Sequence, residues 1–261
     1  MRMRICTVAG VALFFGVNTN AALYTRMIDY KQGDTTCEGY LAYDDAVQGR
    51  RPGVLVVHDW MGCDGYAKMR ADMLARLGYV AFAADIYGKD ARPTNRQEAA
   101  AQAGKYKGDR ALLRARVNAA LDVLKKQPQC DTKRVAAIGY CFGGTTVLEL
   151  ARSGADIAGI VSFHGGLDTP TRDANKIQCK VLICHGADDP YVPATDIAAL
   201  QDELRKAGVD WQMVYYSGAV HAFTRPDAGN DNSKGAAYNQ KADERSWQAM
   251  KDFFAEIFKA Q

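Results

Sequence analysis

The sequence predicts an α/β fold in which a mostly parallel sheet is covered by helices on both faces. Short runs of β-branched and apolar residues alternate with longer segments of helical periodicity along the chain. Several short runs are apolar throughout, as is typical of strands buried on both faces. The 261 residues include 48% hydrophobic ones, enough for a sizeable core, and no Pro-, Gly- or Ser-rich linker divides residues 22–261. We therefore expect one domain over residues 22–261.

Seven strands are expected, each on a short run bounded by turn residues: 39–43, 53–58, 79–84, 134–139, 159–163, 180–184 and 211–216. Five helices are expected between or after them: 66–77, 109–126, 143–152, 194–207 and 237–258. The periodicity is clearest over 109–126, where apolar residues recur at steps of three and four so that one face can pack on the sheet. Pro128 ends that helix.

The first 21 residues have the composition of a cleaved secretory signal peptide. A basic start, Met1 to Arg4, precedes an apolar run from Ile5 to Val17, and small or polar residues follow up to Ala21. The apolar run is too short to span a bilayer as a helix. Removal of residues 1–21 takes away two arginines and no acid, which lowers the formal net charge from +3 to +1. We expect a periplasmic or secreted protein; an uncleaved anchor or a core strand is the alternative.

Composition excludes several classes of function. Lys and Arg number 33 and Asp and Glu 30, so there is no large basic field for a nucleic acid backbone. The sequence lacks a Walker A motif, a strand-linked GxGxxG and an HExxH motif. No CxxC pair is present either. We expect no cofactor, no metal, no nucleic acid partner and no membrane association after signal cleavage.

Six cysteines remain after residue 21, and an oxidising compartment would favour disulfides among them. If Cys141 stays free, the odd number left predicts at least one buried, unpaired thiol, and Cys184 in an apolar run is the best candidate. Cys130 and Cys179 each precede a strand at the same edge of the sheet, so either a disulfide or two separate thiols fits them. The pairing of Cys37 and Cys63 stays open.

The segment Gly139-Tyr140-Cys141-Phe142-Gly143 joins a predicted strand to a predicted helix and fits the nucleophile-elbow pattern, with Cys in the place of Ser. In that pattern the central residue takes a strained turn that lifts its side chain above the sheet. A helix N-terminus there would favour the thiolate of Cys141. A tight turn with an inert Cys, or a loop that cradles phosphate, are the alternatives.

The remaining members of a triad follow in the chain order nucleophile, acid, His that this strand arrangement uses. Asp189 is the predicted acid because Gly186 and Val192 frame it, and Asp188 is then a turn or cap residue; an Asp-Pro turn before the helix at 194 explains both without catalysis. His221 follows the last strand and is the predicted base. The other histidines, His58, His164 and His185, each follow a strand and fit a structural or a catalytic role equally.

A second polar cluster, His58-Asp59-Trp60, follows the strand 53–58 where an oxyanion-hole amide is usually placed. We expect the backbone N–H groups of Trp60 and Phe142 to converge on a developing oxyanion. A capped loop with a buried Trp is the alternative.

Over nearly all of residues 24–258 the chain resembles the dienelactone hydrolase family. Members of this family are carboxymethylenebutenolidase-like α/β-hydrolases. The likeness rests on Val54-Leu-Val-Val-His-Asp-Trp-Met-Gly, Leu77-Gly-Tyr-Val-Ala-Phe-Ala-Ala-Asp-Ile-Tyr-Gly, Gly139-Tyr-Cys-Phe-Gly-Gly, His185-Gly-Ala-Asp-Asp-Pro-Tyr-Val-Pro and Tyr216-Ser-Gly-Ala-Val-His-Ala-Phe.

The resemblance implies an α/β-hydrolase fold and a site with Cys141 as nucleophile, His221 as base and Asp189 as its partner. Asp59 matches the family's carboxylate that contacts the resting thiol, commonly Glu and here one methylene shorter. Lys89 and Arg225 fall where members carry two arginines that bind the substrate carboxylate, although Lys lacks the bidentate fork.

The predicted activity is hydrolysis of a small ester or lactone, anionic if Lys89 and Arg225 bind it, through a thioester on Cys141. A non-catalytic exported binding protein that retains the fold is the competing hypothesis. Acyl or thiol-redox chemistry at Cys141 is a third.

Overall fold

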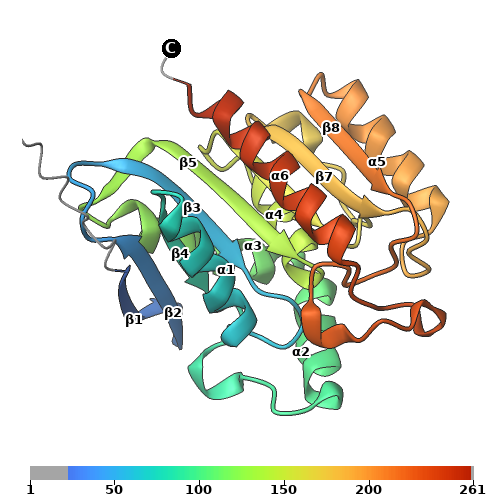
Figure 1. Ribbon diagram of the computed structural model, residues 1–261, viewed down its shortest axis with the longest axis horizontal. Helices are drawn as coiled ribbons and strands as arrows, with labels where there is room; N and C mark the ends of the chain where they lie inside the picture. The colour runs from blue at the N-terminus through green and yellow to red at the C-terminus, as the bar shows by residue number, and fades with distance from the viewer. Residues whose placement is uncertain (1–22, 260–261) are drawn as a thin grey trace, which may run out of the picture.

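The protein is built around one eight-stranded sheet (Figure 1). The computed structural model describes residues 23–259. The strand order is β1-β2-β4-β3-β5-β6-β7-β8. The strands are β1 (Leu23–Gln32), β2 (Thr35–Asp44), β3 (Arg51–Val57), β4 (Val80–Ala84), β5 (Cys130–Tyr140), β6 (Gly159–Phe163), β7 (Lys180–Gly186) and β8 (Trp211–Tyr216). From β4 to β8 all neighbours are parallel, whereas β1 and β2 pair antiparallel. The predicted signal peptide lies outside the described residues.

Helices cover both faces of the sheet, as predicted. They are α1 (Gly65–Arg76), α2 (Arg96–Gly108), α3 (Arg110–Lys125), α4 (Phe142–Arg152), α5 (Ala194–Lys206) and α6 (Gln240–Ile257). One core cluster joins the sheet to α1 and α6, and the other joins its opposite face to α3, α4 and α5. Short 3-10 turns are η1 (Lys89–Ala91), η2 (Ala174–Lys176), η3 (Pro226–Ala228) and η4 (Asn232–Lys234). No helix of residues 23–259 is long and apolar enough to cross a membrane.

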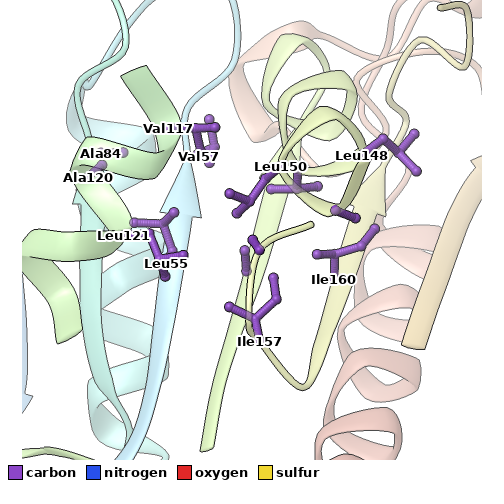
Figure 2. Packing of buried hydrophobic residues seen from close by; sticks show 14 of the residues in the cluster. Leu55, Val57, Ala84, Val117, Ala120, Leu121, Leu148, Leu150, Ile157 and Ile160 are labelled. Atoms are coloured by element: carbon purple, nitrogen blue, oxygen red, sulfur yellow. The ribbon is translucent and has the colours of Figure 1, made fainter. Parts of the chain in front are cut away.

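Helix α3 shows how the predicted periodicity becomes packing. Val117, Ala120 and Leu121 lie against the apolar side chains of β3 and β4 (Figure 2). All three are at most 4% exposed. Burying a Val or Leu side chain contributes roughly 1.5–3 kcal/mol, so Val117 and Leu121 fix α3 on the sheet.

Two elements, β1 and α2, were not predicted, because neither has an apolar face. Strand β1 lies at the sheet edge, and most of its residues are exposed or half-buried. In α2 only Ala99 and Tyr106 are buried. Strand β1 is held by backbone pairing with β2 along its whole length, and α2 packs on α3, the helix that follows it. Hydrophobic periodicity reports neither kind of contact.

The parallel order brings the predicted polar residues to one edge of the sheet. Asp59 and Trp60 follow β3, Cys141 follows β5, and Asp189 follows β7. The loop after β8 carries His221. Because parallel strands all end at this edge, segments that are separated by more than 150 residues meet there.

All six cysteines of the described residues are free thiols. Cys184 is fully buried and unpaired, which confirms that prediction. Cys130 and Cys179 are two separate thiols, the second of the two alternatives, and the reason is the direction of the Cys130 side chain. Cys130 Sγ lies against Gly53 of β3, on the side of β5 away from β6 and β7. The thiol therefore points away from Cys179.

A buried ion network joins α4 to α5. The Arg152 guanidinium, with no exposed side-chain surface, donates to Glu149 Oε1 at 3.0 Å and to both Glu203 carboxylate oxygens at 3.0 and 2.8 Å. Arg114 of α3 also pairs with Glu149 at 2.8 Å. Charges taken out of water need such partners, because an isolated buried charge is strongly destabilising.

We therefore expect Arg152→Leu to lower the free energy of unfolding by roughly 3–5 kcal/mol, because Glu149 and Glu203 lose their shared counter-ion. Urea unfolding followed by far-UV circular dichroism measures the change. Arg205→Leu on α5 is the matched control: Arg205 forms an exposed pair with Asp202, and its loss costs at most about 1 kcal/mol. Equal effects of the two substitutions would contradict this account.

Candidate active site

The turn between β5 and α4 holds Cys141 in a strained backbone conformation, with φ 53° and ψ −112°. A Cβ placed on Gly139 would lie 2.0 Å from the Gly143 carbonyl oxygen, and one on Gly143 would lie 2.2 Å from the Val57 carbonyl oxygen. Only glycine fits at either position. The strand-turn-helix geometry of a nucleophile elbow is therefore present, and the glycine spacing is explained by steric contact.

The structure places Cys141, His221 and Asp189 in one chain of contacts. His221 Nε2 lies 3.0 Å from Cys141 Sγ, and His221 Nδ1 lies 2.8 Å from Asp189 Oδ2. The Asp189 side chain is fully buried, and its other oxygen accepts from the Tyr191 N–H at 2.9 Å. This is the arrangement in which an acid orients an imidazole beside a nucleophile.

The neighbouring Asp188 takes the turn role expected of it. Its carboxylate accepts from the Gly218 N–H at 3.0 Å and is turned away from His221. This bond ties the turn after β7 to the loop that carries the imidazole.

The surroundings of His221 favour a protonated imidazole. Burial opposes protonation of His221, but the charge of Cys141 and the hydrogen bond to Asp189 outweigh it and raise the pKa of His221 to about 10. Cys141 also caps the N-terminus of α4, whose partial positive charge favours an anion.

A cavity of about 710 Å³ opens above the thiol. Its lining includes Cys141 and His221 together with Trp60, Tyr66 and Tyr191. The size suits a small organic substrate, and aromatic walls around a few polar groups are typical of such sites.

The oxyanion role expected of the Trp60 and Phe142 N–H groups stays a prediction, and two observations are compatible with it. Phe142 is the first residue of α4, so its N–H has no acceptor within the helix. Trp60 follows β3 and lines the same cavity as Cys141.

Asp59 does not contact the thiol in the described structure, which corrects that expectation. One oxygen accepts from the Met61 N–H at 2.8 Å, and the other pairs with the guanidinium of Arg225. Burial raises the pKa of Asp59, although the charge of Arg225 opposes this shift. The shorter side chain is thus directed at Arg225 and not at sulfur.

Arg225 lines the cavity as predicted, but its positive charge is already paired with carboxylates of the protein. Beside Asp59, its guanidinium donates to Asp64 at 2.9 Å and to Asp227 at 2.7 Å. Three carboxylates around one guanidinium leave no net positive charge for a substrate.

Lys89 lies away from the cavity, so its predicted role in substrate binding was wrong. Its ammonium pairs with Asp29 at 3.0 Å and with Glu38 at 2.9 Å. Both partners belong to the antiparallel hairpin β1–β2, at the edge of the sheet. Lys89 is a solvent-exposed surface cation.

Sequence reasoning missed two cations of α2 that line the cavity, Arg96 and Lys107. Within residues 23–259 neither forms an ion pair within 4.0 Å of a carboxylate, so both remain free to meet an anion. Without an apolar stripe in α2, nothing in the sequence pointed to this helix.

Groups of three or more His, Cys, Asp or Glu side chains placed to hold a metal ion are absent from the described part of the chain. The acids near Cys141 are each engaged by an arginine, an imidazole or a backbone amide.

Residues 37–258 match the family model described as the dienelactone hydrolase family. The chain belongs to the dienelactone hydrolase family. It is therefore a hydrolase with an α/β-hydrolase fold, and the sequence resemblance is confirmed.

Solved structures and a curated relative agree with this assignment. A dienelactone hydrolase-like promiscuous phosphotriesterase from metagenomic libraries is 47% identical with a TM-score of 0.86, over 90% of this chain and 99% of that one. A structure named m3DLH is 44% identical with a TM-score of 0.87, over 91% and 100%. A Synechocystis sp. protein named "Putative carboxymethylenebutenolidase" is 26% identical over 244 residues, which cover 88% of this chain and 96% of that protein.

The six described thiols differ in environment, which predicts selective alkylation. Five are buried, and burial raises their pKa values, to about 12 for Cys63, Cys179 and Cys184. Cys141 is half-buried and lies beside His221. Iodoacetamide at neutral pH should therefore modify Cys141 alone in the folded protein, as read by peptide mass mapping. His221→Ala should slow this reaction; rapid labelling of a buried cysteine, or no effect of His221→Ala, would contradict it.

Proposed function

We propose that this dienelactone hydrolase family member cleaves a small ester or lactone by nucleophilic catalysis, with Cys141 as nucleophile, His221 as acid and base, and Asp189 as the orienting carboxylate. The observation that carries the proposal is the chain of contacts from sulfur through imidazole to a buried carboxylate, at the base of a cavity.

In the first half-reaction the Cys141 thiolate attacks the carbonyl carbon and forms a C–S bond. The carbonyl electron pair moves onto oxygen, where the N–H groups of Trp60 and Phe142 stabilise it. Loss of one such donor typically costs about 3 kcal/mol of transition-state stabilisation. The tetrahedral species then expels the alkoxide, which takes the proton from His221, and a thioester remains on sulfur.

In the second half-reaction water attacks the thioester while His221 accepts one of its protons. The tetrahedral species collapses, the C–S bond breaks, and the acid leaves. The thiolate and the imidazolium are then restored. Asp189 stays ionised throughout and holds the imidazole in one tautomer.

The substrate we propose is anionic, and the cations that would favour it are Arg96 and Lys107. Both line the cavity and neither is matched by a carboxylate of the described residues. Arg225, in contrast, is held by three carboxylates. The substrate carboxylate would therefore face α2.

The proposal extends to an exported enzyme, in keeping with the basic, apolar and small segments of residues 1–21. A binding protein without turnover is the competing function. The chain of contacts from Cys141 through His221 to Asp189 supports turnover, because binding alone has no use for a thiol 3.0 Å from an imidazole.

A second candidate activity is hydrolysis of a phosphotriester, favoured by the 47% identity with a promiscuous phosphotriesterase. The same thiolate would attack phosphorus, form an S–P bond and expel a phenolate; water would then release the phosphodiester. This reaction and ester hydrolysis share one nucleophile.

The proposed function is tested with p-nitrophenyl acetate, and with diethyl p-nitrophenyl phosphate for the second candidate. The protein should release p-nitrophenolate from the acetate, and Cys141→Ala should abolish this release while the circular dichroism spectrum is unchanged. Turnover that survives in Cys141→Ala would refute the nucleophile. Turnover of neither substrate nor of a panel of lactones by the unmodified protein would favour the binding function.

Asp189→Asn and Asp188→Asn form a matched pair that tests the acid. Asp189→Asn should lower kcat by up to about 10⁴-fold, because an amide stabilises the wrong imidazole tautomer. Asp188→Asn should retain most of the turnover, since an amide oxygen still accepts from the Gly218 N–H. Steady-state kinetics on one ester measure both, and the reverse pattern would move the acid by one position.

Arg96→Met should raise KM for the p-nitrophenyl monoester of a dicarboxylic acid and leave KM for p-nitrophenyl acetate nearly unchanged, the result of losing a uniform-binding contact. Lys107→Met should act in the same direction. Lys133→Met, at the opposite edge of the sheet, is the control and should change neither. Equal effects of Arg96→Met on both esters would show that α2 does not recognise substrate charge.

A further inference from the structure

Backbone strain at non-glycine residues lies around the site in the described part of the chain. Among residues 23–259, the non-glycine residues with positive φ are Cys141, His164 and Ala222. Cys141 is the proposed nucleophile, and Ala222 follows the proposed base. Such strain persists only where surrounding structure imposes it, and it concentrates at functional positions. His164, with φ 41°, has no role in the mechanism given above.

His164 follows β6 and contacts the base directly. Its ring lies 5.2 Å from the His221 ring, centroid to centroid, at an interplanar angle of 65°. The imidazole is 2% exposed and borders the same cavity as Cys141. Its Nδ1 has no hydrogen-bond partner within the described residues.

The other ring nitrogen anchors the loop that carries the base. His164 Nε2 lies 2.8 Å from Thr224 Oγ1, three residues after His221. The same hydroxyl lies 2.7 Å from the Tyr66 hydroxyl, and the Thr224 carbonyl accepts from Arg70 at 2.8 Å. Thr224 is fully buried and is thus fixed between β6 and α1.

The remaining buried histidines lack the positive φ and the ring contact with His221, although the Nδ1 of His185 also has no partner within the described residues. His58 uses both ring nitrogens, Nδ1 toward the Asp59 carbonyl and Nε2 as acceptor of the Ile86 N–H at 3.1 Å. His185 is 2% exposed and packs on Tyr215, with no hydrogen bond or ring contact to His221. Neither has a positive φ. Burial at a strand end therefore does not by itself explain His164.

We propose that His164 is a positioning residue: anchored on Thr224, it packs against His221 and holds that imidazole in the orientation that joins Cys141 to Asp189. A second imidazole suits this place because it can stay neutral. Burial and the neighbouring charge of His221 hold the pKa of His164 well below its usual value. It therefore does not repel a protonated base. The effects on kcat that we expect from this role rest on the proposed function, because they require turnover.

The test compares His164→Phe with His185→Phe, two substitutions of a buried strand-end histidine by a ring of similar size. His164→Phe keeps a ring against His221 and removes the bond to Thr224. We expect kcat on p-nitrophenyl acetate to fall roughly 10- to 100-fold through misplacement of the base, with KM nearly unchanged. Thr224→Val should reproduce the loss, Thr224→Ser should restore turnover, and His185→Phe should retain it.

Alkylation of Cys141 by iodoacetamide provides a readout that needs no turnover. It should slow in His164→Phe and Thr224→Val and stay unchanged in His185→Phe, because only the first two disturb the imidazole beside sulfur. If the unmodified protein hydrolyses no ester, the proposed function fails, while this pattern of alkylation rates still supports the positioning role.

The inference is overturned if folded His164→Phe keeps normal kcat and normal alkylation, if its loss lies in KM alone, or if His185→Phe loses as much. Thermal unfolding is measured for every variant. Should His164→Phe fail to fold, the Thr224 pair decides: equal activity of Thr224→Val and Thr224→Ser overturns the inference.

Discussion

The position of every other group in the site depends on the strained turn at Cys141. A non-glycine residue with φ 53° requires that its neighbours approach closely, and Gly139 and Gly143 allow α4 to begin against the ends of β3 and β5. This contact places the sulfur at the N-terminus of α4 and beside the loop after β3. The loops after β7 and β8 then bring a buried carboxylate and an imidazole to the sulfur. The hydrophobic packing on both faces of the sheet keeps that turn in place.

A second constraint, that buried charges must be paired, decides which residues remain available for a substrate. Arg152 is matched by two glutamates and Arg225 by three aspartates. Arg225 thereby becomes part of the cavity wall, held by Asp59 after β3 and by Asp64 at the cap of α1. The free positive charge at the cavity comes from α2, the least apolar of the helices. In the function we propose, Arg96 and Lys107 recognise the substrate, whereas Arg225 holds the cavity wall together.

The sequence predicted the parts of the structure that local rules determine. The contact of Cys141, Asp189 and His221 could be predicted because a strand-turn-helix motif has a steric signature and because nucleophile, acid and His follow a fixed chain order in this fold. Asp59 and Lys89 were misplaced, since the partner of a side chain depends on tertiary neighbours: Lys89 meets Asp29 on a strand that was not predicted at all. Cys130 and Cys179 were assigned to the correct sheet edge, but the direction of a sulfur atom is set by the pleat and the packing around it. The strain at His164 likewise has no signature in its flanking residues.

The most direct measurement of the central claim, that catalysis passes through a thioester on Cys141, is acid quenching during turnover followed by mass spectrometry of the digested protein. With p-nitrophenyl acetate in excess, we expect the added mass of one acetyl group on the peptide that contains Cys141, present during turnover and lost once substrate is exhausted. Hydroxylamine should remove the group, as expected of a thioester. Turnover with unmodified Cys141, or with the acetyl group on another residue, would contradict the account.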